Sequence, residues 1–140
     1  HLDFDLDLAL SQTDDNPVYY LQYAYVRTNS ILHKAAEFDQ FKDITKEDAK
    51  HLTPEEHLLL KKIVELKDLL KGICNNYQVH LIAYYLLEVA HLFHNYYHHN
   101  RVLDPESVEQ SRGRLFLTIL VRDTFERCLK LMGVSCPETM

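Results

Sequence analysis

Apolar residues recur at spacings of three and four through most of the chain, which is the period of helices that pack on one side. The clearest case begins at Asn16, a favourable N-cap, with Pro17 in the first turn, and we expect this helix to end near Phe38. One half of it carries the core positions Leu21, Ala24, Thr28, Ile31, Leu32 and Ala35. The other half carries Tyr20, Tyr23, Arg27, Ser30 and Lys34.

A second helix is predicted to start at Thr53, a favourable N-cap followed by Pro54, and to be ended by Gly72 and the pair Asn75 and Asn76. Its core stripe is Leu58, Leu59, Ile63, Leu66, Leu69, Leu70 and Ile73. Residues 39–53 mix charges with scattered apolar side chains, which predicts a connecting loop or a short helical turn.

The segment 78–99 is apolar almost all round, which is typical of a central helix. Its main stripe is Val79, Ile82, Leu86, Val89, Phe93 and Tyr96. A last helix follows the turn at Asp104 and Pro105 and stops at Gly133. Its inward positions are Leu117, Leu120, Val121, Cys128 and Leu131, and its outer charge pairs are Asp123/Arg127 and Glu126/Lys130. These segments predict an all-α fold, an antiparallel-type bundle of four long helices with short connecting turns.

Residues 1–15 differ from the rest, because His1–Ala9 alternates apolar and acidic residues with the period of a strand. No second strand is evident to pair with it. We therefore expect an extended or short helical lead-in whose apolar side rests on the bundle or on a neighbour outside this sequence. The chain is interpreted as a fragment of a longer protein, with a lead-in at 1–15 and a helical domain at 16–140.

Composition agrees with a single helical domain: 140 residues with 46% hydrophobic content can bury one core, and three Gly and four Pro are few for a many-turned sheet. Three cysteines without CxxC spacing indicate neither a disulfide framework nor a structural zinc site. No apolar run is long enough to span a membrane. We expect a soluble, cytoplasmic monomer.

The net charge of −6 argues at first against a nucleic-acid partner, because affinity for phosphate comes mainly from Lys and Arg. Five of the acids, however, lie in residues 1–16, which contain no Lys or Arg. The remainder has 15 basic and 16 acidic residues, so it is nearly neutral and can carry a local basic patch. The charge therefore permits an RNA partner without predicting one.

A polar face on the segment 78–99 carries His80, Tyr84, Glu88, His91, His94 and His98, with His99 following. Imidazoles at this spacing could collect a metal ion, but no HExxH arrangement is present. We therefore predict no metal site and interpret the histidines as hydrogen-bonding groups at a helix interface or opposite a polar partner. In the first helix, the ordinary interpretation of Tyr20 and Tyr23 is half-buried packing, with Arg27 a solvated cation.

Three stretches carry a family resemblance: NPVYYLQYAYVR at 16–27, LLEVAHLFHNYYHHNRVL at 86–103 and LFLTILVRDTFERCLKLMGVSCPETM at 115–140. Together with the DFDLDLA lead-in they resemble the C-terminal anticodon-binding (DALR) domain of bacterial arginyl-tRNA synthetases. The resemblance implies a helical bundle that binds the anticodon arm of arginine tRNA. Arginine activation with ATP and Mg²⁺ would belong to a separate catalytic domain in cis, whose HIGH-type and KMSKS-type signatures do not occur here. We expect this fragment to be catalytically inert and to hold no cofactor.

The resemblance also implies which side chains face the anticodon: the tyrosine pair and arginine of the first stretch, a tyrosine near the end of the second, and the family's terminal methionine. They correspond to Tyr20, Tyr23, Arg27, Tyr97 (with Tyr96 as the alternative) and Met140. Unstacked bases can stack on aromatic faces, and arginine can hold a phosphate or a base edge. Two other functions stay open: a protein-interaction module that docks a partner helix on the Tyr20/Tyr23 face, and a histidine-cluster metal bundle.

Overall fold

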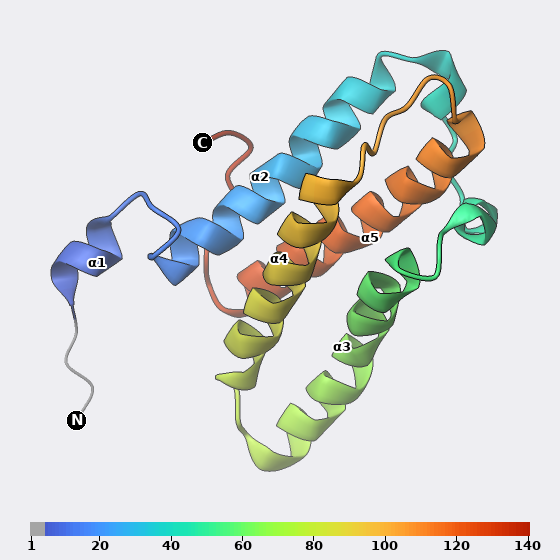
Figure 1. The fold of residues 1–140 in the computed structure, drawn as a ribbon. Helices are drawn as coiled ribbons and strands as arrows, with labels where there is room; N and C mark the ends of the chain where they lie inside the picture. Colours follow the sequence, from blue (N-terminus) through green and yellow to red (C-terminus); the bar gives the residue numbers. More distant parts are fainter. Residues whose placement is uncertain (1–4) are drawn as a thin grey trace.

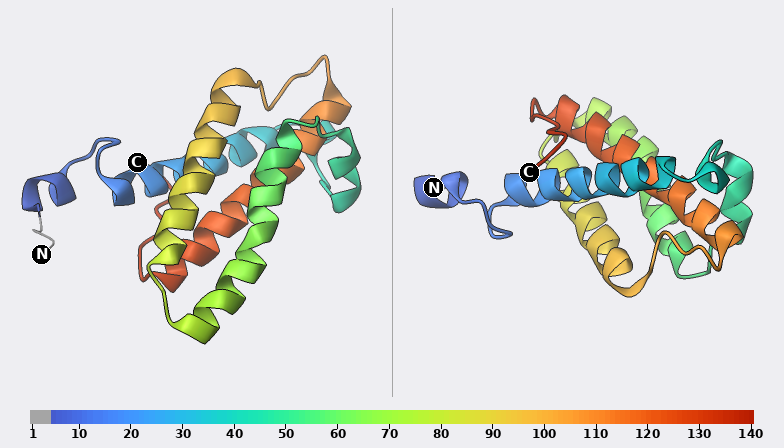
Figure 2. Two further views of the ribbon diagram at one scale, coloured as in Figure 1. Left: turned by 60° about the horizontal axis from the view of Figure 1, so that its bottom comes forward. Right: turned by 90° about the horizontal axis from the view of Figure 1, so that it is seen from above.

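The structure is a computed structural model that describes residues 5–140, and every regular element in this part is a helix (Figure 1). The elements are α1 Leu6–Leu10, α2 Pro17–Ala36, the 3₁₀ helices η1 Asp39–Phe41 and η2 Lys46–His51, α3 Glu56–Asn76, α4 Leu81–His99 and α5 Val108–Leu131. α2 runs antiparallel to α5, and α3 runs antiparallel to α4 (Figures 1 and 2). The predicted bundle of four long helices with short connections is confirmed.

The start of α2 is fixed by Asn16, as predicted. Its Oδ1 accepts from the N–H groups of Val18 and Tyr19 at 3.1 and 3.4 Å, which satisfies two donors that the first helical turn leaves free. Its Nδ2 donates to the carbonyl groups of Ala9 and Ser11 at 3.1 and 2.9 Å. One side chain therefore caps α2 and also fixes the loop that leads into it.

α1 takes the short helical form expected of the lead-in, but it buries no residue against the bundle. Leu6 and Leu10 are 61% and 71% exposed, and α1 extends beyond the N-terminus of α2 (Figure 2). Of the two expected resting places, the bundle is therefore wrong for residues 6–10, while a neighbour outside this sequence stays a prediction. Residues 1–4, which carry the first part of the alternating pattern, lie outside the described residues.

The core lies where α2, α4 and α5 meet, and the predicted stripe of α2 is buried there except for the half-buried Leu32. α4 and α5 contribute the fully buried side chains Leu86, Val89, Phe93, Leu115, Leu117, Val121, Phe125 and Leu129. Three predicted core positions are wrong: Leu58, Val79 and Leu131 are 64%, 66% and 60% exposed. Val79 precedes the first turn of α4, Leu131 is the last residue of α5, and Leu58 lies beside the buried Leu59 on the outer side of α3. Each lies outside the arc that a neighbouring helix covers.

Of the two predicted charge pairs on α5, Glu126/Lys130 forms. Asp123/Arg127 does not, because the Asp123 carboxylate instead accepts from the neighbouring Arg122 at 2.7 Å. Adjacent residues on a helix seldom face each other, but the long arginine side chain can fold back over its neighbour. All three cysteines are free.

A buried carboxylate fixes the start of α3. Glu56 is 1% exposed and its Oε2 accepts from the Thr53 N–H at 2.8 Å, while Thr53 Oγ1 accepts from the Glu56 N–H at 3.3 Å. Thr53 and Glu56 thus form the predicted capping box across the turn that leads into α3, although the residue directly before the helix is Glu55. Arg114 of α5 donates to Glu56 Oε1 at 2.7 Å and to the Arg101 carbonyl at 2.8 Å. Arg114 therefore joins α3, α5 and the segment after α4.

The connection between α2 and α3 is held against α5 by Arg112. Its Nε donates to Asp48 Oδ1 at 2.8 Å, and its Nη1 donates to the carbonyls of Gln40 and Lys42, both at 3.0 Å. Its Nη2 reaches the Asp43 carbonyl at 3.1 Å. A single guanidinium thus satisfies several backbone acceptors of the loop and keeps η1 and η2 close to the start of α5.

Gly113 lies where η2 crosses α5, and its replacement by alanine should destabilise the chain. An added Cβ would be 2.9 Å from the Asp48 carbonyl oxygen and 3.3 Å from the His51 Cβ, so backbone would have to move. We expect the free energy of unfolding to fall by about 1–3 kcal/mol in urea denaturation.

Gly72→Ala is the matched control. Gly72 is inside α3 and does not end it, contrary to the prediction, and an added Cβ there meets nothing within 4 Å. This variant should instead gain roughly 0.5–1 kcal/mol, since alanine loses less backbone entropy in a helix. Equal stability of Gly113→Ala and the unmodified chain would contradict the close approach of η2 to α5.

Candidate nucleic-acid interface

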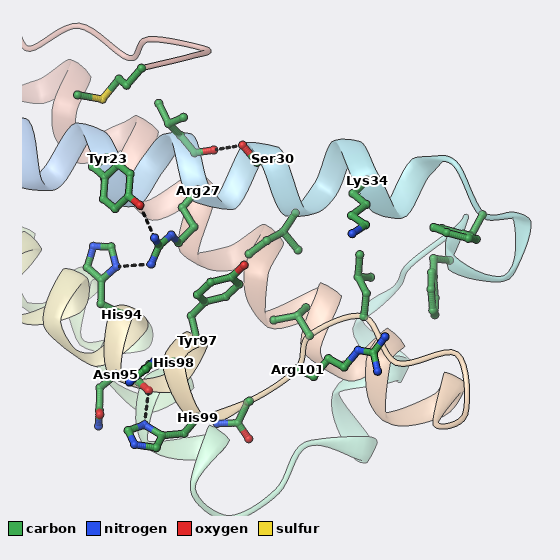
Figure 3. Close-up of a pocket in the computed structure, with 18 of the residues that line it drawn as sticks. Tyr23, Arg27, Ser30, Lys34, His94, Asn95, Tyr97, His98, His99 and Arg101 are labelled. Carbon is green, nitrogen blue, oxygen red and sulfur yellow. Dashed lines mark hydrogen bonds between the residues drawn. The ribbon is translucent and has the colours of Figure 1, made fainter.

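An open groove of about 1620 Å³ lies between α2 and the C-terminal half of α4 (Figure 3). Other parts of its lining come from Asp14, the stretch 38–41, the segment 100–105 and Met140. The five site residues that the family resemblance implies all line this one groove: Tyr20, Tyr23, Arg27, Tyr97 and Met140. They come from three stretches that are far apart in the sequence, so only the fold brings them together.

Arg27 lies at the centre of the groove, between two aromatic rings. Its guanidinium carbon is 4.6 Å from the centre of the Tyr23 ring and 4.8 Å from that of Tyr97. Its Nη2 also donates to the Tyr23 hydroxyl (Figure 3). Cation–π contacts and this hydrogen bond therefore fix a cation and two ring systems relative to each other. Tyr97 keeps 36% of its surface exposed, so its ring is accessible to a ligand.

His94 of α4 also lines the groove, although the sequence placed it only among the interface histidines and not among the anticodon-facing residues. Its ring stacks on Tyr23, with ring centres 5.8 Å apart and planes 17° from parallel, and its Nδ1 is 3.4 Å from Arg27 Nη1. Since a guanidinium only donates, Nδ1 accepts here and Nε2 carries the proton. Burial, with a smaller contribution from the charge of Arg27, lowers the pKa of His94 to about 4, so the ring is neutral at physiological pH.

Tyr20 partly fills the space between the two helices. Its hydroxyl lies 3.1 Å from His91 Nδ1, and its ring centre is 4.8 Å from that of His94. Burial, together with the charge of Asp14, raises the pKa of Tyr20. The packing interpretation of the tyrosines is thus correct in part for Tyr20, and the interpretation of the histidines as interface groups is confirmed for His91 and His94. The sequence signal for this role was the spacing of the histidines, which places them on one face of the helix.

The adjacent residues Tyr96 and Tyr97 have different environments. Tyr96 is 9% exposed, burial raises its pKa, and its hydroxyl has no hydrogen-bond partner within residues 5–140. Tyr97 lies in the groove against Arg27. Of the two alternatives, Tyr97 is therefore the one whose position suits contact with a ligand.

The groove is locally cationic although the chain as a whole is acidic. Arg27, Lys34 and Arg101 line it, with Asp14 as the acid among its lining residues. Such a patch can attract phosphate groups.

In the part of the chain that the structure describes, no group of three or more His, Cys, Asp or Glu side chains could hold a metal ion. Within the same part, no helix is long and apolar enough to cross a membrane.

Comparison with known proteins adds family information to this geometry. Residues 21–140 match the family described as DALR anticodon binding domain. The arginine–tRNA ligase of Geobacter sp. (strain M21) is 43% identical over 141 residues, which cover 99% of this chain and 25% of that protein. Arginine–tRNA ligase 1 of Halalkalibacterium halodurans is 39% identical over 140 residues, covering 100% of this chain and 25% of that protein.

Among solved structures, the arginyl-tRNA synthetase of Thermus thermophilus superposes with a TM-score of 0.79 at 30% identity. The matched region covers 99% of this chain and 24% of that one, so this chain spans about a quarter of the length of the relatives it matches. The family match extends over all four long helices and includes every residue of the groove that the sequence singled out except Tyr20. The chain therefore belongs to the DALR anticodon-binding domain family.

Proposed function

We propose that this chain is the anticodon-binding part of an arginine–tRNA ligase and that the groove binds the anticodon arm of arginine tRNA. The observation that carries the proposal is the position of Arg27 between the rings of Tyr23 and Tyr97. Single-stranded bases stack on aromatic side chains with about 1–3 kcal/mol each, and a guanidinium can hold a phosphate or a base edge in the same site. The cationic lining supports the same partner.

The rest of such a ligase would lie outside this chain. A catalytic domain in cis would bind ATP and Mg²⁺, activate arginine and transfer it to the tRNA, while the domain at 16–140 contributes recognition alone. The lead-in at 1–15 would belong to the catalytic region. In this proposal the protein acts in the cytoplasm as a monomer. Sedimentation of the full-length protein tests the oligomeric state.

A helical protein-interaction module is a weaker explanation of the same face. A partner helix would need an open stripe along Tyr20 and Tyr23, but α4 already occupies it with His91 and His94. What remains open is a groove with cations and exposed ring surface, which suits a flexible RNA loop better than a helix.

Tyr97→Ala tests the proposal in the full-length protein. We expect the affinity for arginine tRNA to fall about tenfold, because a base loses its stacking surface, and Tyr97→Phe should retain most of the affinity. Binding is measured by fluorescence anisotropy at one fixed salt concentration. Thermal stability is measured alongside, because Tyr97 is only 36% exposed and its ring also packs against Arg27 and Phe93.

Tyr84→Ala is the matched control, since Tyr84 lies on the same helix, is 61% exposed and is outside the groove. It should bind arginine tRNA as the unmodified protein does. A tRNA with a substituted anticodon should bind the unmodified protein more weakly than arginine tRNA does. The same substitution should cause a smaller loss of affinity in the Tyr97→Ala protein. Equal affinities of the Tyr97→Ala and Tyr84→Ala proteins would remove this groove as the RNA site.

A further inference from the structure

Residues 132–140 leave α5 and turn back beside α2 (Figures 1 and 2). The turn is made by Gly133, whose φ of 72° is one that side chains other than glycine rarely adopt. The Gly133 N–H donates to the Lys130 carbonyl at 3.1 Å and the Val134 N–H to the Leu129 carbonyl at 2.9 Å. This is the Schellman arrangement, and it gives the segment a defined direction as it leaves the helix.

Gln22 of α2 holds the next residue of this segment. Its Nε2 donates to both the carbonyl oxygen and the hydroxyl of Ser135, at 3.1 and 2.9 Å. Val134 and Cys136, on either side, pack against the edge of the core. Within the described chain, residues 137–140 make no further hydrogen bond of their own, yet Met140 lines the groove. Apart from a long bond from the Cys136 thiol to the Glu126 carbonyl at 3.9 Å, the Gln22 contact is thus the last polar anchor before Met140.

The side chain of Met140 cannot hold this position through its own burial, because it is 51% exposed. A flexible thioether is useful as an apolar contact to a base only if the backbone that carries it is held in place. If the segment were free, each unrestrained residue would add conformational entropy that tRNA binding must remove. Gln22 lies on the same helix as Tyr23 and Arg27, so one rigid element carries the groove residues and the anchor of the segment.

We propose that Gln22 is a positioning residue, which holds Ser135 and thereby keeps Met140 in the wall of the groove. The expected contribution of Gln22 to tRNA binding rests on the proposed function. Its expected contribution to the position of residues 135–140 is independent of that function. Gln22 does not itself line the groove, so it acts through the segment and not through contact with RNA.

Two measurements test the proposal. In the full-length protein, Gln22→Ala should weaken arginine tRNA binding by about threefold to tenfold, with little change in melting temperature. Asn29→Ala is the control, an amide two helical turns further along α2 and away from Ser135, and it should bind normally. In a double-mutant cycle, Gln22→Ala should add little to Met140→Ala, because both remove the same ordered contact.

The second measurement needs no tRNA. This sequence contains two methionines, Met132 and Met140. In the full-length protein, ¹³C-methyl labelling of methionine follows both, and each signal is assigned by its loss in the Met132→Leu or Met140→Leu variant. In Gln22→Ala the Met140 methyl signal should narrow and move to the position of a free methionine, while that of Met132 stays in place. An unchanged Met140 signal overturns the proposal.

The outcomes separate the anchor from the function of the groove. In one outcome, the Met140 signal moves and Tyr97→Ala binds tRNA weakly, but Gln22→Ala binds tRNA normally. The role of Gln22 in tRNA binding is then wrong, and the assignment of the groove as the tRNA site stands. If neither variant impairs binding, the proposed function fails, and the methyl signal alone decides whether Gln22 anchors the segment. Additive effects of Gln22→Ala and Met140→Ala would also overturn action through Met140.

Discussion

Replacing Arg27 by alanine should weaken binding of arginine tRNA by about 2 kcal/mol, roughly 30-fold, which is the largest effect of any single change in the groove. The change removes the cation itself, the hydrogen bond to the Tyr23 hydroxyl and the contact that holds the Tyr97 ring. Arg27→Lys keeps the charge but lacks the planar group between the rings, so it should recover only part of the affinity. Dissociation constants at several salt concentrations measure both variants.

Lys34→Ala is the comparison for Arg27→Ala, because Lys34 lies on the same helix and lines the same groove without an aromatic partner. Its loss should be smaller and should disappear at high salt, as expected for a phosphate contact. The loss at Arg27 should persist in part at high salt. Unchanged tRNA affinity of Arg27→Ala, in a protein that melts normally, would exclude the central part of the groove from binding.

Arg114→Leu should lower the free energy of unfolding by about 3–5 kcal/mol, because it leaves the Glu56 carboxylate buried without its cation. Glu56 is 1% exposed, and Arg114 also donates to the Arg101 carbonyl, so the start of α3 and the segment after α4 lose a shared partner. Domains of this size have a total free energy of unfolding of roughly 5–15 kcal/mol, so Arg114→Leu removes a large share of the stability. Urea denaturation followed by circular dichroism measures it.

Arg122→Leu provides the control for Arg114→Leu. Arg122 also pairs with a carboxylate on α5, but both partners are about a third exposed, so its loss should cost less than about 1 kcal/mol. Adding Glu56→Leu to Arg114→Leu should recover part of the lost stability, since no unpaired charge then remains in the interior. A cost for Arg114→Leu as small as that for Arg122→Leu would contradict the buried pair.

Features that depend on a few neighbouring residues could be predicted from the sequence. The cap at Asn16, the capping box of Thr53 and Glu56 and the stop at Gly133 are confirmed, because each is decided by hydrogen bonds between residues within five positions. Helical period also gave the core face of α2. It failed for Leu58 and Leu131, because period alone cannot say how wide an arc a neighbouring helix covers or how far along the axis it extends.

The groove was less predictable, because its contacts join distant parts of the chain. Adjacent residues on a helix point about 100° apart, so whether Tyr96 or Tyr97 faces α2 depends on how α4 is rotated in the bundle. The position of His94 beside Tyr23 depends on the same rotation. Gln22 and Ser135 are 113 positions apart, and no local pattern connects them. In these cases the residue type was informative only after the helices had been placed.

Arg27 in the groove differs from Arg112 and Arg114, which join the helices, in what neutralises its charge. Arg112 and Arg114 are paired with the carboxylates of Asp48 and Glu56, so their charges are compensated within the protein. Arg27 forms no ion pair within residues 5–140 and is oriented by uncharged acceptors, a phenol and an imidazole. An incoming phosphate would therefore meet a preorganised cation. No carboxylate of the described chain would have to be displaced from Arg27 first, so no internal anion competes with the phosphate during association.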